Sequence, residues 1–274
     1  MDGSGAAETR ADIALLALPA VAMLAVYPLP EPVKRSFALT YTDPTVVTAF
    51  TAHFVHLGGE HLIANLIAYL LVVGVAYQLA RIQRSLPQFR VLFVATLVGV
   101  PFALSGLNVA LVRPRVGFGF SGVLAGFFGV LSLTLSGYVR RALRVDLARG
   151  WDSLPYFADL SLIGLVLVWR APGTWVVAVT AGVVTAAYGG RLYTSLRRTE
   201  SLWHDWVLRP GYAELGVLGG ALVLAFPLLA FPPSAGGDGS VVNFYAHFLG
   251  FSLTAIAGYL LPPIDGVETP VPTA

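Results

Sequence analysis

Cysteine is absent from this chain of 274 residues, which excludes a disulfide framework, a thiolate metal site and a cysteine nucleophile. Charged residues are also scarce, at 12%, whereas soluble globular domains carry about 25%. This low fraction excludes an ordinary soluble domain and an intrinsically disordered chain. The 17 basic and 15 acidic residues leave a net charge of only +2, which is too balanced for a nucleic-acid-binding surface. No metal-ligand or cofactor motif is evident, so we expect neither a metal nor a cofactor.

Hydrophobic residues make up 56% of the chain and the mean hydropathy is +0.74, values typical of a polytopic membrane protein. A transmembrane helix needs about 17–25 mostly apolar residues, and on this basis the sequence predicts an all-α membrane protein with about eight spans. The predicted spans are 13–29, 61–80, 91–112, 118–138, 155–169, 173–190, 212–231 and 243–261. The third is interrupted by Pro101, and the short fifth carries Asp159.

The fifth and sixth spans are separated by only a few residues around Pro172. We expect them to form a tight helical hairpin over 155–190; the alternative is one broken, partly interfacial segment. No repeat or linker divides the chain, so 1–274 is expected to be a single membrane domain with flexible ends at 1–12 and 265–274. The N-terminus lacks the basic region of a signal peptide, and we therefore expect the first span to be retained.

Basic residues are distributed unevenly between the loops of this eight-span arrangement. Cytoplasmic loops are enriched in Lys and Arg, and one side of the predicted membrane receives 12 basic residues while the other receives 5. This bias predicts that both termini lie in the cytoplasm (N-in/C-in). The 12 are Arg10, Arg81, Arg84, Arg90, Arg140, Arg141, Arg144, Arg149, Arg191, Arg197, Arg198 and Arg209, and the 5 are Lys34, Arg35, Arg113, Arg115 and Arg170.

Histidines gather at the outer ends of predicted spans. The four that do so are His53, His56, His61 and His247. The fifth, His204, is expected to be an ordinary loop residue. Polar residues within a span are costly and indicate a functional site. His61 and Asn65 are four residues apart and share a helix face, where both can donate hydrogen bonds, although a polar contact between two helices would explain this pair equally well.

Ser121 lies in the motif Gly119-Phe120-Ser121-Gly122 at the start of the fourth span. Taken alone, this motif is explained by close helix packing, which uses small residues. The nucleophilic serine of an α/β-hydrolase follows a strand. We expect no strand ahead of Ser121, and this expectation excludes that class of enzyme.

His247 lies about one turn inside the eighth span. A buried imidazole needs a partner for each ring nitrogen, so His247 is expected to meet polar groups of another helix. Gly250, Thr254 and Gly258 recur at four-residue spacing along the same span. Such a stripe of small residues lets a neighbouring helix approach closely.

The predicted topology brings four polar residues to one depth near the outer face: His61, Asn65, Ser121 and His247. A serine hydroxyl is a weak nucleophile until a base accepts its proton, and His247 is the candidate base. Donors to a developing oxyanion could come from His61, Asn65 and the backbone N–H of Ser121. No carboxylate is expected at this depth on these spans, so the pattern predicts a Ser/His dyad.

These residues resemble the rhomboid family of intramembrane serine proteases. The resemblance rests on three motifs in the family order, each on a separate span. They are His56-x4-His61-x3-Asn65, Gly119-Phe120-Ser121-Gly122 and Ala246-His247-x-x-Gly250.

The resemblance implies a role for each of these positions. It implies that Ser121 is the nucleophile, that His247 is the general base, and that His61 and Asn65 form the oxyanion hole. The supporting residues that it implies are His56, Gly119, Gly122 and Gly250. It also implies a six-helix core. We interpret the hairpin 155–190 as an insertion into that core and 212–231 as the gating helix.

The chain departs from the family pattern at three places. The family core places one helix between the serine and histidine helices, whereas this chain has room for three. Many relatives have a Trp-Arg pair in the loop before the second core helix, where this chain has Val47 and Thr48. Relatives often have an aromatic residue one turn after the serine, where it stacks on the catalytic histidine, and this chain has Ala125 at that position. His247 therefore needs another neighbour to hold its ring.

The implied activity is that of a serine endopeptidase that cleaves transmembrane protein substrates in the lipid bilayer, near the outer face. The segment 232–239 is expected to be a mobile lid over the site or a plain connecting loop. The alternatives are an inactive rhomboid-like protein that binds membrane clients, a small transporter, and a structural membrane protein. The abundance of arginine over lysine suggests a GC-rich genome, and we expect a prokaryotic plasma membrane. The sequence leaves the oligomeric state open.

Overall fold

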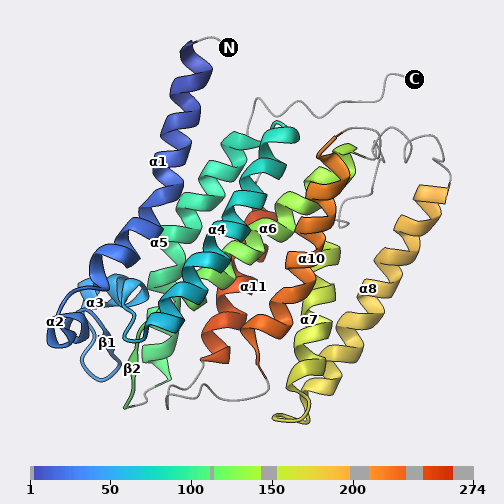
Figure 1. The fold of residues 1–274 in the computed structure, drawn as a ribbon. Helices are drawn as coiled ribbons and strands as arrows, with labels where there is room; N and C mark the ends of the chain where they lie inside the picture. The colour runs from blue at the N-terminus through green and yellow to red at the C-terminus, as the bar shows by residue number, and fades with distance from the viewer. Residues whose placement is uncertain (1–2, 112–113, 143–152, 198–209, 233–242, 262–274) are drawn as a thin grey trace.

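The computed structural model describes residues 3–111, 114–142, 153–197, 210–232 and 243–261, which are mostly helical (Figure 1). The long helices are α1 (Gly3–Val26), α4 (Gly59–Ile82), α5 (Leu86–Ala110), α6 (Ser121–Ala142), α7 (Leu154–Leu167), α8 (Thr174–Arg197), α10 (Tyr212–Ala230) and α11 (Phe244–Leu260). Six of these, all except α7 and α11, are long and apolar enough to cross a membrane. The chain is therefore an all-α, multi-pass membrane protein, as predicted.

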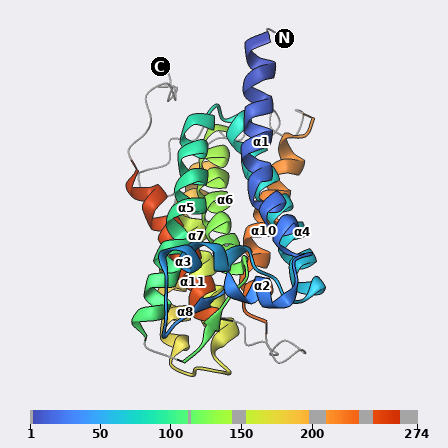
Figure 2. The ribbon, with the colours of Figure 1, turned by 90° about the vertical axis from the view of Figure 1, so that its left-hand side faces the viewer.

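Five short elements lie at the end of the bundle opposite the N-terminus (Figure 1) and cross one of its sides (Figure 2). They are α2 (Glu31–Ser36), β1 (Leu39–Thr40), α3 (Val46–Thr51), η1 (Ala52–Phe54) and β2 (Val116–Gly117). β1 and β2 pair antiparallel, with Leu39 opposite Gly117. The expectation of no strand ahead of Ser121 is thus wrong, because the pairing partner of β2 comes from a distant loop that hydropathy does not reveal. A two-residue strand is still far from the sheet of an α/β-hydrolase.

α6 is the central helix and packs against α4, α5, α10 and, most extensively, α11. Small residues allow the close approach of α6 and α11. A Cβ added at Gly250 would overlap the carbonyl group of Gly122, and one added at Gly126 would lie 3.0 Å from Oγ1 of Thr254. The predicted stripe of small residues on α11 therefore faces α6.

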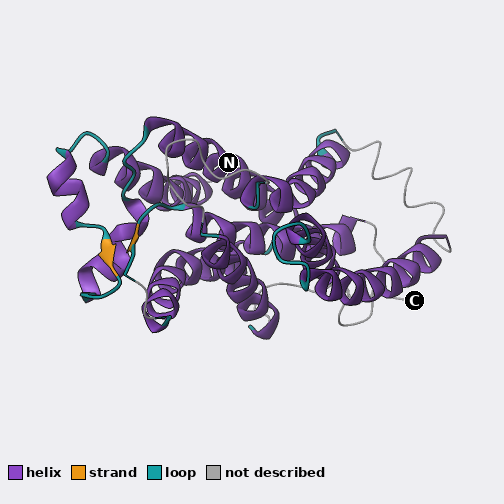
Figure 3. Ribbon diagram, turned by 90° about the horizontal axis from the view of Figure 1, so that it is seen from below, coloured by secondary structure: helices purple, strands orange, loops and turns teal. Residues whose placement is uncertain are grey.

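α7 and α8 form a helical hairpin at the edge of the bundle, on the side away from the two strands (Figures 1 and 3). The two helices approach closely, since a Cβ at Gly164 would lie 2.7 Å from the backbone nitrogen of Ala178. The alternative of a single broken segment does not fit this arrangement. On the core-facing part of α7, Asp159 is fully buried, and neither of its carboxylate oxygens has a hydrogen-bond partner among the described residues.

Two expectations about the helices are wrong. Helix α5 continues through Pro101, so the proline does not interrupt this span: it removes one backbone hydrogen bond, and the packing of the flanking turns maintains the helix. The first helix, predicted over 13–29, begins at Gly3; the flexibility expected for residues 1–12 stays a prediction. The predicted flexible end at 265–274 lies outside the described residues, and so does His204.

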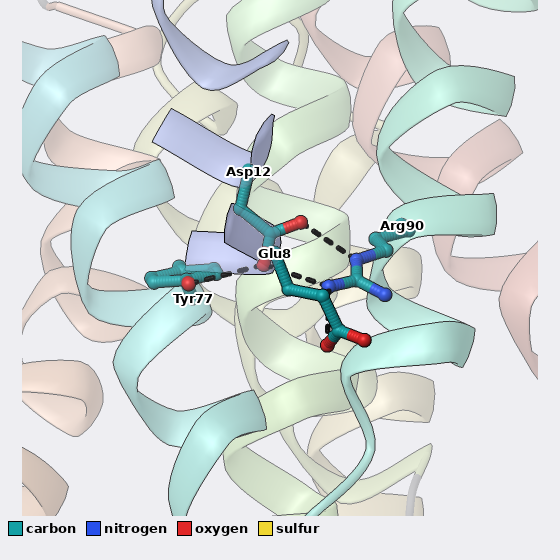
Figure 4. A network of polar contacts seen from close by, with 4 residues as sticks. All are labelled: Glu8, Asp12, Tyr77 and Arg90. Atoms are coloured by element: carbon teal, nitrogen blue, oxygen red, sulfur yellow. Dashed lines mark hydrogen bonds and ion pairs between the residues drawn. The ribbon is translucent and has the colours of Figure 1, made fainter. Parts of the chain in front are cut away.

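A polar network connects the N-terminal part of α1 to the neighbouring helices (Figure 4). Asp12 is only 5% exposed and receives two hydrogen bonds from Arg90, with Nε–Oδ1 and Nη2–Oδ2 distances of 2.6 and 2.9 Å. The Tyr77 hydroxyl donates to the same carboxylate at 3.1 Å, and Glu8 lies 3.9 Å from Arg90. The network ties α1 to α4 and α5.

Arg90→Ala is expected to lower the free energy of unfolding by about 1–3 kcal/mol, because it leaves the Asp12 carboxylate buried with the Tyr77 hydroxyl as its remaining partner. Asp12→Ala should lower the free energy of unfolding by less, since the Arg90 side chain is partly exposed and can turn its charge to water. Thermal unfolding in detergent measures both. Arg35→Ala is the control: its pair with Glu31 is exposed and should be worth less than about 1 kcal/mol. Equal effects at Arg90 and Arg35 would show that the network does not stabilise α1.

Candidate active site

Ser121 and His247 meet at the ends of two packed helices. Ser121 is the first residue of α6, and His247 lies in the first turn of α11. The Oγ of Ser121 is 2.8 Å from Nε2 of His247, inside the range of about 2.6–3.2 Å that proton transfer requires. Ser121 is partly exposed, whereas His247 is buried. The predicted proximity of the two side chains is thus confirmed as geometry, while their catalytic role stays a prediction.

The second ring nitrogen of His247 defines the tautomer of the imidazole. Nδ1 lies 2.7 Å from the carbonyl oxygen of Ala230, which can only accept a hydrogen bond. Nδ1 therefore carries the proton, and Nε2 is left as the acceptor for the Ser121 hydroxyl. A backbone carbonyl at the end of α10 thus orients the ring, which is the task of the carboxylate in a catalytic triad.

An aromatic side chain also holds the ring of His247. Phe231 directly follows α10 and meets His247 edge-to-face, with ring centroids 6.1 Å apart and planes at 83°. Ala125 is buried in α6 and has no ring to stack. Phe231 is therefore the neighbour that the sequence required but did not identify.

Backbone hydrogen bonds hold the segment that leads into Ser121. The Gly119 N–H donates to the Ala52 carbonyl at 3.0 Å, and the Phe120 N–H donates to Nε2 of His56 at 3.4 Å. Gly119 has φ of +106°, a conformation that side chains with a Cβ rarely adopt. The first N–H groups of α6, which have no intrahelical partner, follow directly. The start of α6 therefore offers oxyanion donors with a favourable helix dipole.

Two histidines support this segment, His56 from a buried position and His53 from a partly buried one. His56 is fully buried, and its Nδ1 lies 3.3 Å from the Phe54 carbonyl, so Nδ1 carries the proton and Nε2 accepts from Phe120. Burial, with the charge of His61 as a smaller cause, lowers the pKa of His56 from its usual 6.5 to about 4. Burial also lowers the pKa of His53 to about 4, against hydrogen bonds to the backbone of Pro101 and Gly119. Both rings are neutral at pH 7.

We expect the melting temperature in detergent to fall as the pH is lowered from 6.5 to about 4. The unfolded chain binds protons on His53 and His56 more readily than the folded protein in this window, so acid favours unfolding. His56→Gln keeps an acceptor for the Phe120 N–H but does not titrate, and should give a shallower fall. If this substitution left the pH dependence of the melting temperature unchanged, protonation of His56 would not contribute to unfolding in acid.

The two predicted oxyanion residues differ in their surroundings. A Cβ added at Gly119 would lie 2.8 Å from Cε1 of His61, so the imidazole rests against the segment leading into Ser121. Asn65 is buried, and its Nδ2 donates to the His61 carbonyl of the same helix at 2.8 Å. Its Oδ1 has no hydrogen-bond partner in the described ranges. The structure thus brings His61 to the segment that leads into Ser121, and the second Nδ2 hydrogen of Asn65 is the one left for another acceptor.

Sequence reasoning missed two residues that fix the start of α11. The Oδ1 of Asn243 accepts from the Ala246 N–H at 3.1 Å, and its Nδ2 donates to Oδ1 of Asn108 at 2.9 Å. Asn243 is therefore the N-cap that holds the first turn of α11 against α5. An asparagine directly before an apolar helix is a recognisable cap signal, whereas nothing in the sequence pairs it with Asn108.

Of the predicted lid at 232–239, the segment 233–239 lies outside the described residues. The three glycines implied as supporting residues occupy crowded positions. Gly119 lies against His61, Gly122 against Leu104, and Gly250 against Gly122.

Comparisons of the chain with protein-family models, curated proteins and solved structures give no match.

Proposed function

We propose that the chain is an intramembrane serine endopeptidase of the rhomboid type, which cleaves transmembrane protein substrates near the outer membrane face. One observation carries this proposal: Nε2 of His247 lies 2.8 Å from Oγ of Ser121 while Nδ1 is bonded to the Ala230 carbonyl. This tautomer is the one that a general base requires. The three motifs that resemble the rhomboid family support the same assignment.

In the proposed mechanism, Ser121 attacks the scissile carbonyl as Nε2 of His247 accepts its proton. The tetrahedral oxyanion is stabilised by the N–H groups at the start of α6, by His61 and by the second Nδ2 hydrogen of Asn65. Protonated His247 then donates its proton to the leaving amine, and the acyl-enzyme forms. Water from the outer face, deprotonated by His247, attacks the ester. The second tetrahedral intermediate then collapses as His247 returns this proton to the leaving Ser121 Oγ, which releases the carboxylic acid product and restores the free enzyme.

The proposal includes the finer topology. Eight helices cross the membrane with both termini in the cytoplasm, and a rhomboid-like core of six helices carries α7 and α8 as an inserted hairpin. The peripheral position of α8, which packs mainly on α7, supports the insertion. Substrate enters laterally beside α10. The host membrane is a prokaryotic plasma membrane.

An inactive rhomboid-like protein that binds membrane clients is the second candidate. The hydrogen bonding of Asn65 favours it, because one of the two Nδ2 hydrogens is bonded to the carbonyl of its own helix, which leaves a single hydrogen for an oxyanion. The ordered pair of Ser121 and His247 favours an active enzyme.

Labelling by a fluorophosphonate separates the two candidates, because this probe reacts with a serine that an adjacent base activates. We expect one adduct on the wild-type protein, mapped to Ser121 by mass spectrometry, and none on His247→Ala. The client-binding candidate predicts no adduct on either protein. An adduct of equal yield on both proteins would remove His247 from the mechanism.

A further inference from the structure

The tip of the α7–α8 hairpin reaches the first residue of α11. The Arg170 guanidinium lies over the ring of Phe244, with its Cζ 5.0 Å from the ring centroid. The tip itself is held by a hydrogen bond from the Arg170 N–H to the Leu167 carbonyl, at 2.9 Å. The neighbouring Trp169 is 92% exposed, so the two adjacent residues of the tip differ in what they contact.

Ring contacts continue from Phe244 to the candidate base. The ring centroids of Phe244 and Phe231 are 5.6 Å apart, and those of Phe231 and His247 are 6.1 Å apart. Phe231 is 1% exposed and also contacts Phe226 at 6.0 Å. A continuous path of packed side chains thus joins the hairpin tip to the imidazole.

This path acts on the one ring whose orientation matters most. The hydrogen bond from Nδ1 to Ala230 fixes one edge of the His247 ring, but it leaves the plane of the ring free to tilt about that bond. Phe231 limits the tilt from the side, and Phe244 limits the movement of Phe231. A cation over an aromatic face is attracted to it by the ring quadrupole, so Arg170 holds Phe244 in place from the outside.

We propose that Arg170 is a positioning residue for His247, acting through Phe244 and Phe231. The hairpin of α7 and α8 is then part of the catalytic apparatus rather than an appendage on the lipid side. This inference rests on the proposed protease function and extends it to an element outside the three motifs. Arg170 itself touches neither Ser121 nor the ring of His247 in this path.

The test compares Arg170→Gln, Arg170→Lys and Trp169→Ala, reconstituted in liposomes with a single-span reporter substrate. Arg170→Gln should lower kcat about fivefold and leave KM within about twofold, because a misaligned base weakens the transition state and not substrate binding. Arg170→Lys should recover most of this loss, since an ammonium also binds an aromatic face. Trp169→Ala, the matched control, should keep the wild-type kcat.

A double variant tests the path itself. Phe244→Leu should lower kcat by itself, and adding Arg170→Gln should lower it little further, because both changes act on one contact. Additive losses would overturn the path, as would a rise in KM with unchanged kcat for Arg170→Gln, which would make Arg170 a substrate contact. Equal kcat for Arg170→Gln and wild type would also overturn it.

Fluorophosphonate labelling of Ser121 separates this inference from the function on which it rests. If the wild-type protein is labelled and cleaves the substrate, and Arg170→Gln has the same kcat, the positioning role alone is overturned. Absence of both labelling and cleavage in the wild-type protein would overturn the proposed function and the positioning role together. The melting temperature of each variant is measured beside that of the wild type, and kcat is expressed per folded protein. Loss of fold is therefore not counted as loss of kcat.

Discussion

His247→Ala is expected to lower kcat for cleavage of a transmembrane substrate by about 10³-fold, with little change in KM. In the proposed mechanism the imidazole accepts the Ser121 proton only as the transition state forms, so its loss removes transition-state stabilisation and leaves substrate binding intact. General acid–base catalysis is worth about 10²–10⁴-fold. Steady-state cleavage of a reporter substrate in liposomes measures the effect.

Ser252→Ala is the matched control for His247→Ala. Ser252 is a buried polar residue of the same helix, and its Oγ lies 3.3 Å from the Tyr156 hydroxyl, away from the dyad. Its loss should leave kcat near the wild-type value. If both variants lost activity to the same extent, the effect would come from the packing of α11 and not from the base.

Gly250→Ala should lower the free energy of unfolding by about 1–3 kcal/mol and kcat by about 10²-fold. The added Cβ would overlap the Gly122 carbonyl, and since this obstacle is backbone, α11 has to move away from α6. Overpacking of this kind costs about 1–3 kcal/mol. The same movement separates His247 from Ser121, and a misplacement of about 1 Å can cost about 10²-fold in rate.

Gly74→Ala controls for the change of residue type. No atom of the described residues lies within 4 Å of a Cβ built at Gly74 in α4. Alanine has the higher helix propensity, so this variant should be as stable as the wild type or slightly more so, with unchanged kcat. Thermal unfolding and cleavage rates are measured on both variants. A Gly250→Ala protein that behaves like Gly74→Ala would show that the α6–α11 approach is not tight.

Much of the fold follows from the sequence because apolar length is a local signal. The hydropathy pattern predicts the eight long helices, with most boundaries within a few residues. It misses residues 3–12 of α1, which contact the rest of the bundle through the pairing of Asp12 with Arg90 across 78 positions. It also fails at β2, whose partner strand lies in another loop. Both failures come from contacts between distant segments, which no local pattern encodes.

The candidate site also combines features that have a local sequence signal with features that depend on contacts between distant segments. The meeting of Ser121 with His247 could be predicted, because span direction and residue depth are readable from charge and hydropathy. The orientation of His247 could not, because it depends on a backbone carbonyl at Ala230 and on Phe231. A carbonyl has no sequence signature, and one phenylalanine among 16 is not distinguished by its spacing.

Cleavage by Ser121→Ala tests the central claim most directly. Wild-type protein and this variant are reconstituted in liposomes with a single-span reporter substrate, and the products are identified by mass spectrometry. We predict that the wild type releases a fragment cut in the outer half of the span and that Ser121→Ala releases at least about 10³-fold less. Equal amounts of product from both proteins, or no product from either, would contradict the assignment of an intramembrane serine protease.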